Sequence, residues 1–576
     1  MAWLAANLAF ITAILVVLPQ IVGDFWAFTL ALFLLYAVAC LGLGLSWGQA
    51  GLLSLGQGFF VGFSAYTSGL ILIGFSASPW LFPLLGLSVI APGLIAYFLG
   101  CMIFHGRAQN TAFFAIITLA LILLAAQIAT AWESVTGGYN GLRNIPGLPG
   151  FSELEDAYTV SAVALGLSMM FAAWIMQTPL GVLWRALSQD ERRVAFLGFN
   201  HNQLKSVAFG LSGLFGGIAG TLYAPQNSLV TPDLFGFLLS TSFVVWVAIG
   251  GRNTLYGPVL GAIGIGLATN TLRESIGFWE VVLAVIFIVA VLYFRKGLTG
   301  TVEPAIKRRF ERNDRVRKSA PERHSAMTFD RIDIENLNLS VGNVGILEDL
   351  DLTIGSPGIY CLIGPNGAGK TTIFNAMTGE LEAQSGTVSM LGARGIKMDA
   401  RTQTIAGLGR KFQVPSVFDE LTVGENLAIA LWSGRSSRRD LLRMSLLDWE
   451  SPVLAELERR FPFLAGRRQM VGSLSHGQRQ VLDLAMVLCT EPRLILLDEP
   501  CAGLSLAETN EVISTVRWAV DRFQATAMII EHDMAMVREL ADRVFVVHNG
   551  SMLFEGSVAE VQSNDAVQAV YTGIAK

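Results

Sequence analysis

Apolar runs of about 20 residues recur through the first 294 residues of the chain and then stop. A helix that crosses the hydrocarbon core of a bilayer needs about 20 consecutive apolar residues. From Arg295 onward, charged residues occur at a density that is ordinary for soluble proteins. The sequence therefore predicts a polytopic all-α membrane domain over residues 1–300, a basic cytoplasmic linker over 301–327 and a soluble domain over 328–576.

We expect roughly ten membrane spans in the apolar half of the chain. The first run lacks a basic flank before it and a small-residue cleavage site after it. It is therefore predicted to be a span and not a cleaved signal peptide. The expected spans cover residues 3–22, 25–47, 51–75, 80–104, 111–130, 159–176, 206–223, 235–249, 254–272 and 278–294.

Lysine and arginine residues fall on one side of these spans if the spans alternate in direction. Cations in short loops stay on the cytoplasmic side of a membrane. The soluble domain follows Arg295 and Lys296, so we expect it in the cytosol. The cationic loops hold Arg107, Arg185, Arg192, Arg193, Lys205 and Arg252, whereas the opposite loops hold Asp24, Glu153, Glu155, Asp156 and Asp233.

The expected spans carry no convincing Asp, Glu, Lys or Arg near their middle. Such residues usually mark proton or ion relays, so the pattern argues against a secondary transporter. The spans instead carry glycine and small polar residues, which favour either close helix packing or a solute pathway along the backbone. The candidate pathway residues are Gln49, Ser54, Gln57 and Tyr66.

A glycine-rich loop, GPNGAGKTT, follows a short apolar run at 358–362 that we expect to be a strand. It matches the phosphate-binding pattern G-x-x-x-x-G-K-T between a strand and a helix. The glycines let backbone N–H groups surround phosphates, and the helix adds its positive N-terminus. Lys370 offers a cation to the terminal phosphates and Thr371 a hydroxyl to Mg²⁺, so ATP and Mg²⁺ are the expected ligands. The candidate binding residues are Gly364, Pro365, Asn366, Gly367, Ala368, Gly369, Lys370, Thr371 and Thr372.

Two carboxylates end a second apolar strand, LILLDEP. Asp498 is placed to bind Mg²⁺, and Glu499 is placed to polarise the attacking water. A further loop, LSHGQ, begins a helix and forms another phosphate-binding arrangement through Ser475, Gly477 and Gln478. One domain needs only one such arrangement for its own nucleotide. The second arrangement therefore predicts a head-to-tail pair of ATPase domains with two nucleotides between them.

Through these motifs, residues 328–576 resemble the ATP-binding-cassette superfamily, whose ATPase domain has an α/β P-loop NTPase fold. The resemblance implies that Gln413, in RKFQVP, senses Mg²⁺ as a metal-site residue and contacts the permease. It also implies that His532, in IIEHDM, touches the γ-phosphate. Two positions depart from the pattern: Val341 stands where many members have an aromatic residue against adenine, and Ser505 where many have aspartate.

The membrane half carries the stretches SWGQAGLLSLGQGFFVGFSAYT, FFAIITLAL, TGGYNGLRNIPG and VAIGGRNTLYGPVLGA in that order. With them, residues 25–300 resemble the permease subunits of branched-chain amino acid and urea importers. The resemblance implies ATP-driven import across a bacterial inner membrane with an extracytoplasmic solute-binding protein and a second permease and ATPase protomer. The motifs leave branched-chain amino acids and urea or amides open as solutes. An exporter half-transporter, the alternative, would usually show about six long spans with extended cytoplasmic helices, unlike the roughly ten short, glycine-rich spans expected here.

The segment at 181–205, GVLWRALSQDERRVAFLGFNHNQLK, is amphipathic and too polar to span a bilayer. It is either a solvated loop or a short helix along the membrane that docks onto the ATPase half. We favour the helix, because a coupled transporter requires such a contact.

The formal net charge of −5 comes without a long acidic or basic tail, so we expect no nucleic-acid partner. The basic linker is expected to lie near anionic lipid headgroups. The five cysteines show no metal-ligand spacing and are expected to be small buried residues in a reducing compartment.

Overall fold

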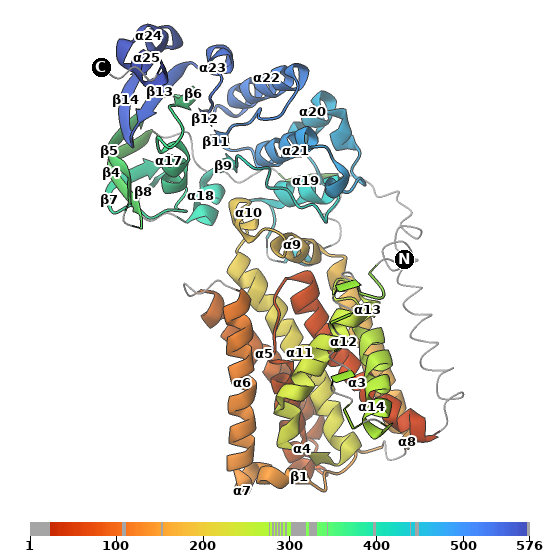
Figure 1. Ribbon diagram of the computed structural model, residues 1–576. Helices are drawn as coiled ribbons and strands as arrows, with labels where there is room; N and C mark the ends of the chain where they lie inside the picture. Colours follow the sequence, from red (N-terminus) through yellow and green to blue (C-terminus); the bar gives the residue numbers. More distant parts are fainter. Residues whose placement is uncertain are drawn as a thin grey trace. The chain divides into compact units, whose positions relative to one another are not determined.

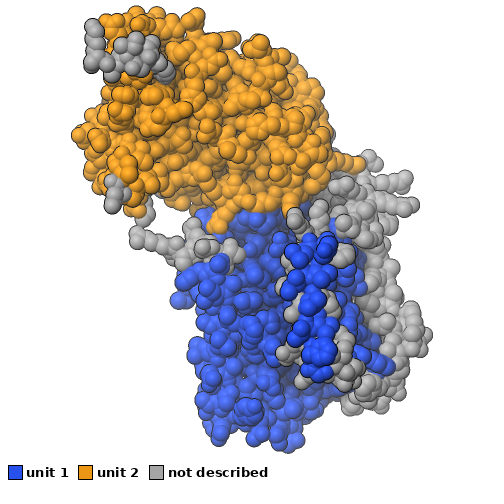
Figure 2. Space-filling view, viewed as in Figure 1, with its two compact units in different colours: residues 1–188, 201–314 blue, residues 189–200, 315–576 orange. Residues whose placement is uncertain are grey.

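The computed structural model describes residues 24–105, 111–150, 154–275, 318–321 and 331–572, with gaps at 343, 396–398, 438 and 444–448, and scattered positions between 277 and 300. The chain forms two compact units, which Figure 2 distinguishes by colour. Unit 1 comprises residues 1–188 and 201–314, and unit 2 comprises residues 189–200 and 315–576. Most of the predicted linker lies outside the described residues, so its boundaries stay predictions.

Unit 1 is built from apolar helices, as its sequence predicts (Figure 1). A two-stranded antiparallel ribbon joins β1 (Leu142–Arg143) to β2 (Leu229–Val230). The helices are α3 (Asp24–Leu43), continued by a π-helical turn at Gly44–Gln49, α4 (Gln57–Phe75), α5 (Leu81–Phe104), α6 (Thr111–Ala131), α7 (Glu133–Thr136), α8 (Leu154–Met176), α9 (Pro179–Leu187), α11 (His201–Asn227), α12 (Phe237–Gly250), α13 (Tyr256–Leu260) and α14 (Gly266–Ser275).

Six helices within the described residues are long and apolar enough to cross a membrane. Another expected span, 235–249, forms the shorter helix α12, and 254–272 forms α13 and α14 with a π-helical turn between them. The expected span at 3–22 and most of the one at 278–294 lie outside the described residues, so the count of ten stays a prediction. The six are Trp26–Gln49, Gln57–Phe75, Leu81–Phe104, Ala112–Ala131, Asp156–Met176 and His201–Asn227.

Several predicted helix boundaries are wrong. The span expected from residue 159 begins at Leu154, and the one expected to end at residue 223 ends at Asn227. The span expected from residue 51 begins at Gln57, because Gly51 takes a positive φ of 75° and the chain stays irregular up to that point. The span expected from residue 206 begins at His201, because polar residues here extend the helix beyond its apolar stretch. Hydropathy marks the membrane-sized core of a helix and not its ends.

Helix α11 packs against α3, α4 and α5 (Figure 1), and its glycines allow the close approach. A Cβ atom at Gly220 would overlap the carbonyl oxygen of Val61 on α4, and one at Gly217 would overlap that of Val89 on α5. Small residues let transmembrane helices bring their backbones together. The packing interpretation of these glycines is therefore confirmed.

Unit 2 contains two large sheets, one small two-stranded sheet and the helices that surround them (Figure 1). The continuous apolar run LILLD forms the fully buried parallel strand β11, as expected for a strand covered on both faces. The six-stranded sheet has the order β14 (Ser551–Gly556), β13 (Arg543–His548), β6 (Gly358–Ile363), β12 (Thr526–Ile530), β11 (Leu494–Asp498) and β9 (Leu408–Lys411), and the four-stranded sheet has the order β5 (Val344–Ile354), β4 (Ile332–Val341), β7 (Ser385–Met390) and β8 (Ala393–Gly395). A third, two-stranded pairing joins β3 (Lys318–Ser319) to β10 (Trp449–Glu450) in parallel.

Hydroxyl side chains fix several helix starts in unit 2. Thr422, Ser475, Ser505 and Ser557 each cap a helix and form a capping box with the residue three positions later. The helices are α10 (Glu191–Phe196), α17 (Lys370–Met377), α18 (Ala400–Ala406), α19 (Val423–Trp432), α20 (Pro452–Arg460), α21 (His476–Cys489), α22 (Leu506–Phe523), α23 (Met534–Leu540), α24 (Val558–Ser563) and α25 (Asp565–Thr572).

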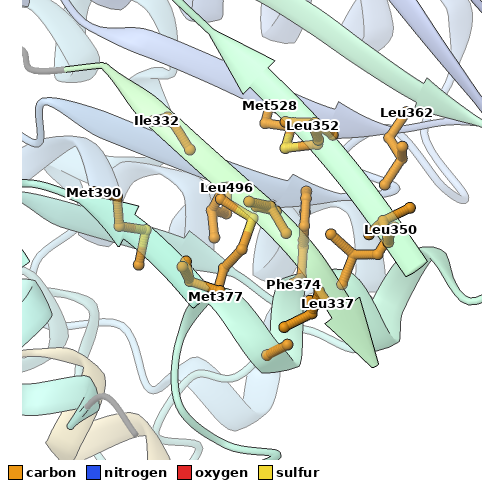
Figure 3. Packing of buried hydrophobic residues seen from close by; sticks show 14 of the residues in the cluster. Ile332, Leu337, Leu350, Leu352, Leu362, Phe374, Met377, Met390, Leu496 and Met528 are labelled. Atoms are coloured by element: carbon orange, nitrogen blue, oxygen red, sulfur yellow. The ribbon is translucent and has the colours of Figure 1, made fainter. Parts of the chain in front are cut away.

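One apolar cluster joins both sheets of unit 2 to helix α17, as Figure 3 shows. Phe374 and Met377 of α17 are fully buried between side chains such as Leu350 of β5 and Leu496 of β11. The same cluster includes Phe196, which α10 contributes from the middle of the membrane half of the sequence. The core therefore fixes the start of α17, where the glycine-rich loop ends.

We expect Gly220→Ala to destabilise unit 1 by about 1–3 kcal/mol, because the added methyl group must displace the α4 backbone. Gly86→Ala in α5 is the matched control, since nothing lies within 4 Å of a Cβ atom there. The test is the melting temperature of the purified full chain in detergent. Equal melting temperatures for the two variants would contradict close packing at Gly220.

Candidate functional site

The glycine-rich loop spans residues 364–369 between the end of β6 and the start of α17. Its conformation requires glycine at Gly364 and Gly369, whose φ angles are 154° and 100°. A Cβ atom at Gly364 would overlap the carbonyl oxygen of Val547, and one at Gly369 would lie 2.8 Å from Leu347 Cδ2. Asn366 and Gly367 form the exposed tip, while Ala368 is buried and accepts a hydrogen bond from Gly550 N at 3.1 Å. The loop thus has the backbone shape that the sequence predicts.

Lys370 is buried at the first position of α17. Its Nζ donates hydrogen bonds to the carbonyl oxygens of Gly364 at 2.7 Å and Pro365 at 2.9 Å. Burial lowers the pKa of the Lys370 ammonium, and the carboxylates of Glu499 and Asp498 oppose that shift. The loop therefore holds a cation beside two anions, where it can meet a phosphate group.

The structure brings Thr371 and Asp498 together from α17 and the end of β11. The Thr371 hydroxyl donates to Asp498 Oδ2 at 3.2 Å. Asp498 is 2% exposed, and its Oδ1 has no hydrogen-bond partner among the described residues. Burial is the main cause that raises the pKa of this carboxyl group. The Thr371 hydroxyl and the buried Asp498 Oδ1 are oxygen ligands of the kind that a hard divalent cation such as Mg²⁺ binds.

Glu499 and His532 also meet, although 33 positions separate them in the chain. Glu499 follows β11 with a positive φ of 45°, and its backbone N donates to Ile530 O at 3.0 Å. Its carboxylate forms a hydrogen bond with Nε2 of His532. His532 lies just after the end of β12. Because β11 and β12 are parallel neighbours, the carboxyl ends of both strands place these side chains at one edge of the sheet.

The other predicted site residues lie on different elements. Gln413 is exposed just after β9, and its carbonyl oxygen accepts from Gln480 Nε2 at 3.4 Å. Ser475 caps α21 and exchanges hydrogen bonds with Gln478, and Gly477 follows in the first turn. None of the hydrogen bonds described for these residues reaches the glycine-rich loop.

The two departures from the superfamily pattern have distinct surroundings. Val341 ends β4 and is 49% exposed, so an aliphatic side chain stands where an aromatic residue is common. Ser505 caps α22, and its hydroxyl donates to Glu508 Oε2 at 2.7 Å. A serine at this position is therefore explained by helix capping.

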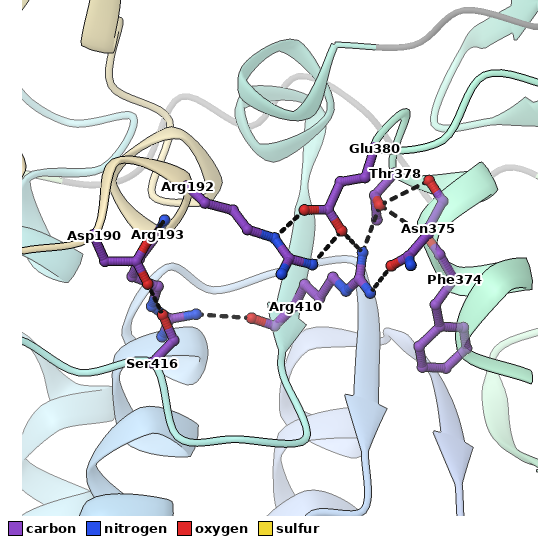
Figure 4. Close-up of polar contacts among 9 residues, drawn as sticks. All are labelled: Asp190, Arg192, Arg193, Phe374, Asn375, Thr378, Glu380, Arg410 and Ser416. Atoms are coloured by element: carbon purple, nitrogen blue, oxygen red, sulfur yellow. Dashed lines mark hydrogen bonds and ion pairs between the residues drawn. The ribbon is translucent and has the colours of Figure 1, made fainter. Parts of the chain in front are cut away.

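A cluster that the sequence did not reveal surrounds α10, as Figure 4 shows. Arg193 is 1% exposed and pairs with Asp483 at 2.5 Å between Nη2 and Oδ1. Its Nη1 donates to Arg410 O at 2.9 Å. Arg192 pairs with Glu380, which also accepts from Arg410 Nη1 at 2.6 Å. The solvated-loop alternative is thus wrong for residues 191–196, which form a helix packed within unit 2.

The candidate pathway residues of unit 1 are all buried. Gln57 Nε2 donates to the carbonyl oxygens of Ala39 at 3.0 Å and Ser212 at 3.2 Å. Gln49 donates to Asn253 O at 3.0 Å, and Ser54 accepts from Gly56 N at 3.1 Å. The Tyr66 ring stacks on Phe235 with 5.7 Å between centroids. These contacts place the four residues in the helix-packed interior, and their role in a pathway stays a prediction.

Comparison with known proteins assigns a family to each half. Residues 25–294 match the family described as the permease component of branched-chain amino acid transport systems. Residues 347–502 match the family described as ABC transporter.

The LivG proteins of two bacteria match the second half over almost their whole length. The high-affinity branched-chain amino acid transport ATP-binding protein LivG of Salmonella typhimurium is 31% identical over 248 residues, which are 42% of this chain and 96% of LivG. LivG of Escherichia coli K12 is 30% identical over 43% of this chain and 99% of its own length. The crystal structure of the ADP conformation of an ATP-binding cassette of an ABC transporter is 26% identical, with a TM-score of 0.37, over 43% of this chain and all of the other.

Within the part of the chain that the structure describes, six membrane-sized helices precede the glycine-rich phosphate loop. The permease match likewise precedes the ABC transporter match. The protein is therefore a multi-pass membrane protein whose cytoplasmic domain binds and hydrolyses ATP. The chain belongs to the ABC transporter family, and it joins a permease domain of the branched-chain amino acid transport type to an ABC ATPase domain in one polypeptide.

Proposed function

We propose that this chain is the fused permease and ATPase subunit of an ATP-driven importer for branched-chain amino acids in a bacterial inner membrane. One observation carries the proposal. The permease half matches a branched-chain amino acid transport family, and the ATPase half independently matches LivG over nearly its full length. Urea and small amides remain the second candidate solutes, because the stretches RKFQVPSVF and GGRNTLYG lean towards the urea branch.

We propose the following roles for the residues of the site. The backbone N–H groups of residues 364–372 bind the β- and γ-phosphates, and Lys370 neutralises their charge. Thr371, Asp498 and Gln413 would hold Mg²⁺, which when bound neutralises the phosphate oxygens during hydrolysis. Glu499 accepts a proton from the attacking water, and His532, held by Glu499, contacts the γ-phosphate.

Ser475, Gly477 and Gln478 are proposed to bind the nucleotide of a second ATPase domain. This role fits their position at the N-terminus of α21, a helix of 14 residues, and the exposure of Ser475. A second copy of this chain or a paralogous permease and ATPase would complete the transporter. An extracytoplasmic solute-binding protein would deliver the solute.

Coupling is proposed to run through the cytoplasmic segment that contains α10. ATP favours the closed pair of ATPase domains, and hydrolysis removes that preference. Differential binding of this kind switches the permease between its two access states.

We expect Glu499→Gln to lower the ATP turnover number at least about 100-fold, because the variant loses the proton acceptor for the attacking water. Its affinity for ATP should stay within about twofold of that of the unchanged protein, whereas Lys370→Ala should lose nucleotide binding. Phosphate release and binding of a fluorescent ATP analogue measure the two effects.

Glu555→Gln is the matched control, since Glu555 pairs with Arg543 on the surface of unit 2. Full hydrolysis by the Glu499→Gln variant would contradict the proposed role of this carboxylate.

Glu531 is a third carboxyl group of the site, after Asp498 and Glu499, and it precedes His532 in the chain. It is 6% exposed, and burial raises its pKa to about 7 from an ordinary value of 4.5. Between these two values the unfolded chain releases the proton and the folded chain keeps it. The free energy of unfolding therefore falls as the pH rises from about 4.5 to about 7 and then levels off, by at most about 3 kcal/mol from this group.

We expect Glu531→Gln to remove this part of the pH dependence, because the amide does not ionise. The melting temperature of the full chain should fall less between pH 5 and pH 8 in this variant than in the unchanged protein. Glu555→Gln should keep the original dependence, since its carboxylate is accessible to water. Identical melting profiles for Glu531→Gln and the unchanged protein would show that Glu531 does not titrate in this range.

The import direction predicts that a solute-loaded binding protein raises the ATPase rate severalfold in lipid. The test uses the full chain with its partner subunits in nanodiscs and adds the binding protein with leucine, with urea or without solute. Stimulation by hydrophobic compounds in the absence of a binding protein would instead support the exporter alternative.

A further inference from the structure

Helix α10 belongs to the permease half by sequence and to the ATPase unit by structure. Its residues lie inside the stretch that matches the permease family, residues 25–294. The structure nevertheless assigns residues 189–200 to unit 2, where Phe196 enters the main apolar cluster. The permease portion of the sequence thus supplies part of the interior of the ATPase unit.

The Arg193 guanidinium is fixed from two directions. Its Nη2 lies 2.5 Å from Asp483 Oδ1, and both side chains are at most 1% exposed. Its Nη1 donates to Arg410 O at 2.9 Å. The backbone N of Arg193 donates to Asp190 Oδ1, and Asp190 in turn accepts from the Ser416 hydroxyl at 2.6 Å. A planar, forked donor is suited to binding two acceptors in a set geometry.

These partners belong to two elements of the nucleotide site. Asp483 lies on α21, which begins at the LSHGQ loop. Arg410 lies on β9, which ends at Lys411, two positions before Gln413. Arg193 therefore links the helix that presents one proposed nucleotide contact to the strand that leads to another.

Arg192 makes a different kind of contact. It pairs with Glu380, which follows α17, but its side chain is 52% exposed. Its guanidinium also lies 4.1 Å from the centre of the Phe412 ring. An exposed ion pair contributes little and is screened by salt. The buried Arg193 pair is the contact that fixes orientation.

A buried ion pair is a poor way to gain stability, because removing two charges from water costs about as much as their attraction returns. Arg193 is better explained by the orientation that it imposes on α21 and β9. Lys411 is a second buried cation near Asp483, and it also stabilises the negative charge of this carboxylate. Removal of Arg193 therefore leaves Asp483 compensated, and the fold should survive.

We propose that Arg193 is a positioning residue for ATP hydrolysis: by pairing with Asp483 and Arg410 O, it sets the orientation of α21, and with it the LSHGQ loop, relative to β9. The proposal rests on the nucleotide-binding role proposed for Ser475, Gly477 and Gln478. Through this contact, the permease-derived helix α10 controls the rate of the ATPase without touching the nucleotide.

The test compares Arg193→Met, Arg193→Lys, Asp483→Asn and the double variant Arg193→Met/Asp483→Asn in the full chain with its partner subunits in nanodiscs. Arg193→Met and Asp483→Asn should each lower kcat for ATP hydrolysis at least tenfold and leave KM for ATP within twofold. The double variant should be no slower than the slower single variant, because both changes break one interaction. Arg193→Lys should recover part of the loss, since it restores the charge but not the forked donor.

Arg459→Met is the matched control, because Arg459 pairs with Glu456 at the surface and is 71% exposed. It should keep the kcat of the unchanged protein. Melting temperature and bound nucleotide per chain report on folding in every variant. Unchanged kcat in Arg193→Met would overturn the proposal. A loss of kcat that only matches a loss of folded, nucleotide-binding protein would equally overturn it, because the residue would then be structural.

The outcome does not depend on import. If the unchanged protein hydrolyses ATP but transports no solute, the proposed importer function fails while the kcat comparison still decides the role of Arg193. If Glu499→Gln is fully active, the proposed chemistry fails instead.

Discussion

The hydrogen-bonding needs of the backbone constrain this chain most strongly, because a bilayer offers no water to satisfy them. The membrane half meets the constraint with helices, which pair their N–H and C=O groups internally. Glycines such as Gly217 and Gly220 then let the backbone of α11 lie directly against the backbones of α4 and α5. In the water-exposed half the same groups pair between strands, and the six-stranded sheet results.

The sheet in turn positions the chemistry. Parallel strands β11, β12 and β6 end at one edge of the sheet. Asp498 is the last residue of β11, and Glu499, His532 and the glycine-rich loop follow β11, β12 and β6. The apolar cluster beneath them holds α17, so that Lys370 and Thr371 face the carboxylates. Local sequence motifs thus act together only because a shared core brings their strands side by side.

The site contacts within the ATPase half were the easiest to predict. The loop at residues 364–372 and the LILLDEP strand are each recognisable from a short run of consecutive residues. The structure brings the two motifs together, and the Thr371 hydroxyl donates to Asp498 Oδ2. Most apolar spans in residues 25–272 were also predicted, because hydropathy reports directly on burial in lipid. Their ends were less predictable: α4 starts six residues later than expected, where the backbone at Gly51 departs from helical geometry.

The cluster around α10 shows what sequence patterns do not reveal. The stretch DERRVAF indicates an amphipathic helix, but Arg193 and Asp483 are 290 positions apart and neither belongs to a motif. A charged residue in a polar segment is normally expected at the surface, yet Arg193 is buried. Only the tertiary fold identifies such a pair.

ATP hydrolysis in the cytoplasmic domain is proposed to drive solute into the cell. Uptake of radiolabelled leucine into proteoliposomes, with the full chain, its partner subunits, an external binding protein and ATP sealed inside, tests this claim most directly. We expect accumulation above the external concentration with ATP and none with a non-hydrolysable analogue. Equilibration of leucine that is independent of ATP, or ATP-driven movement in the outward direction, would contradict it.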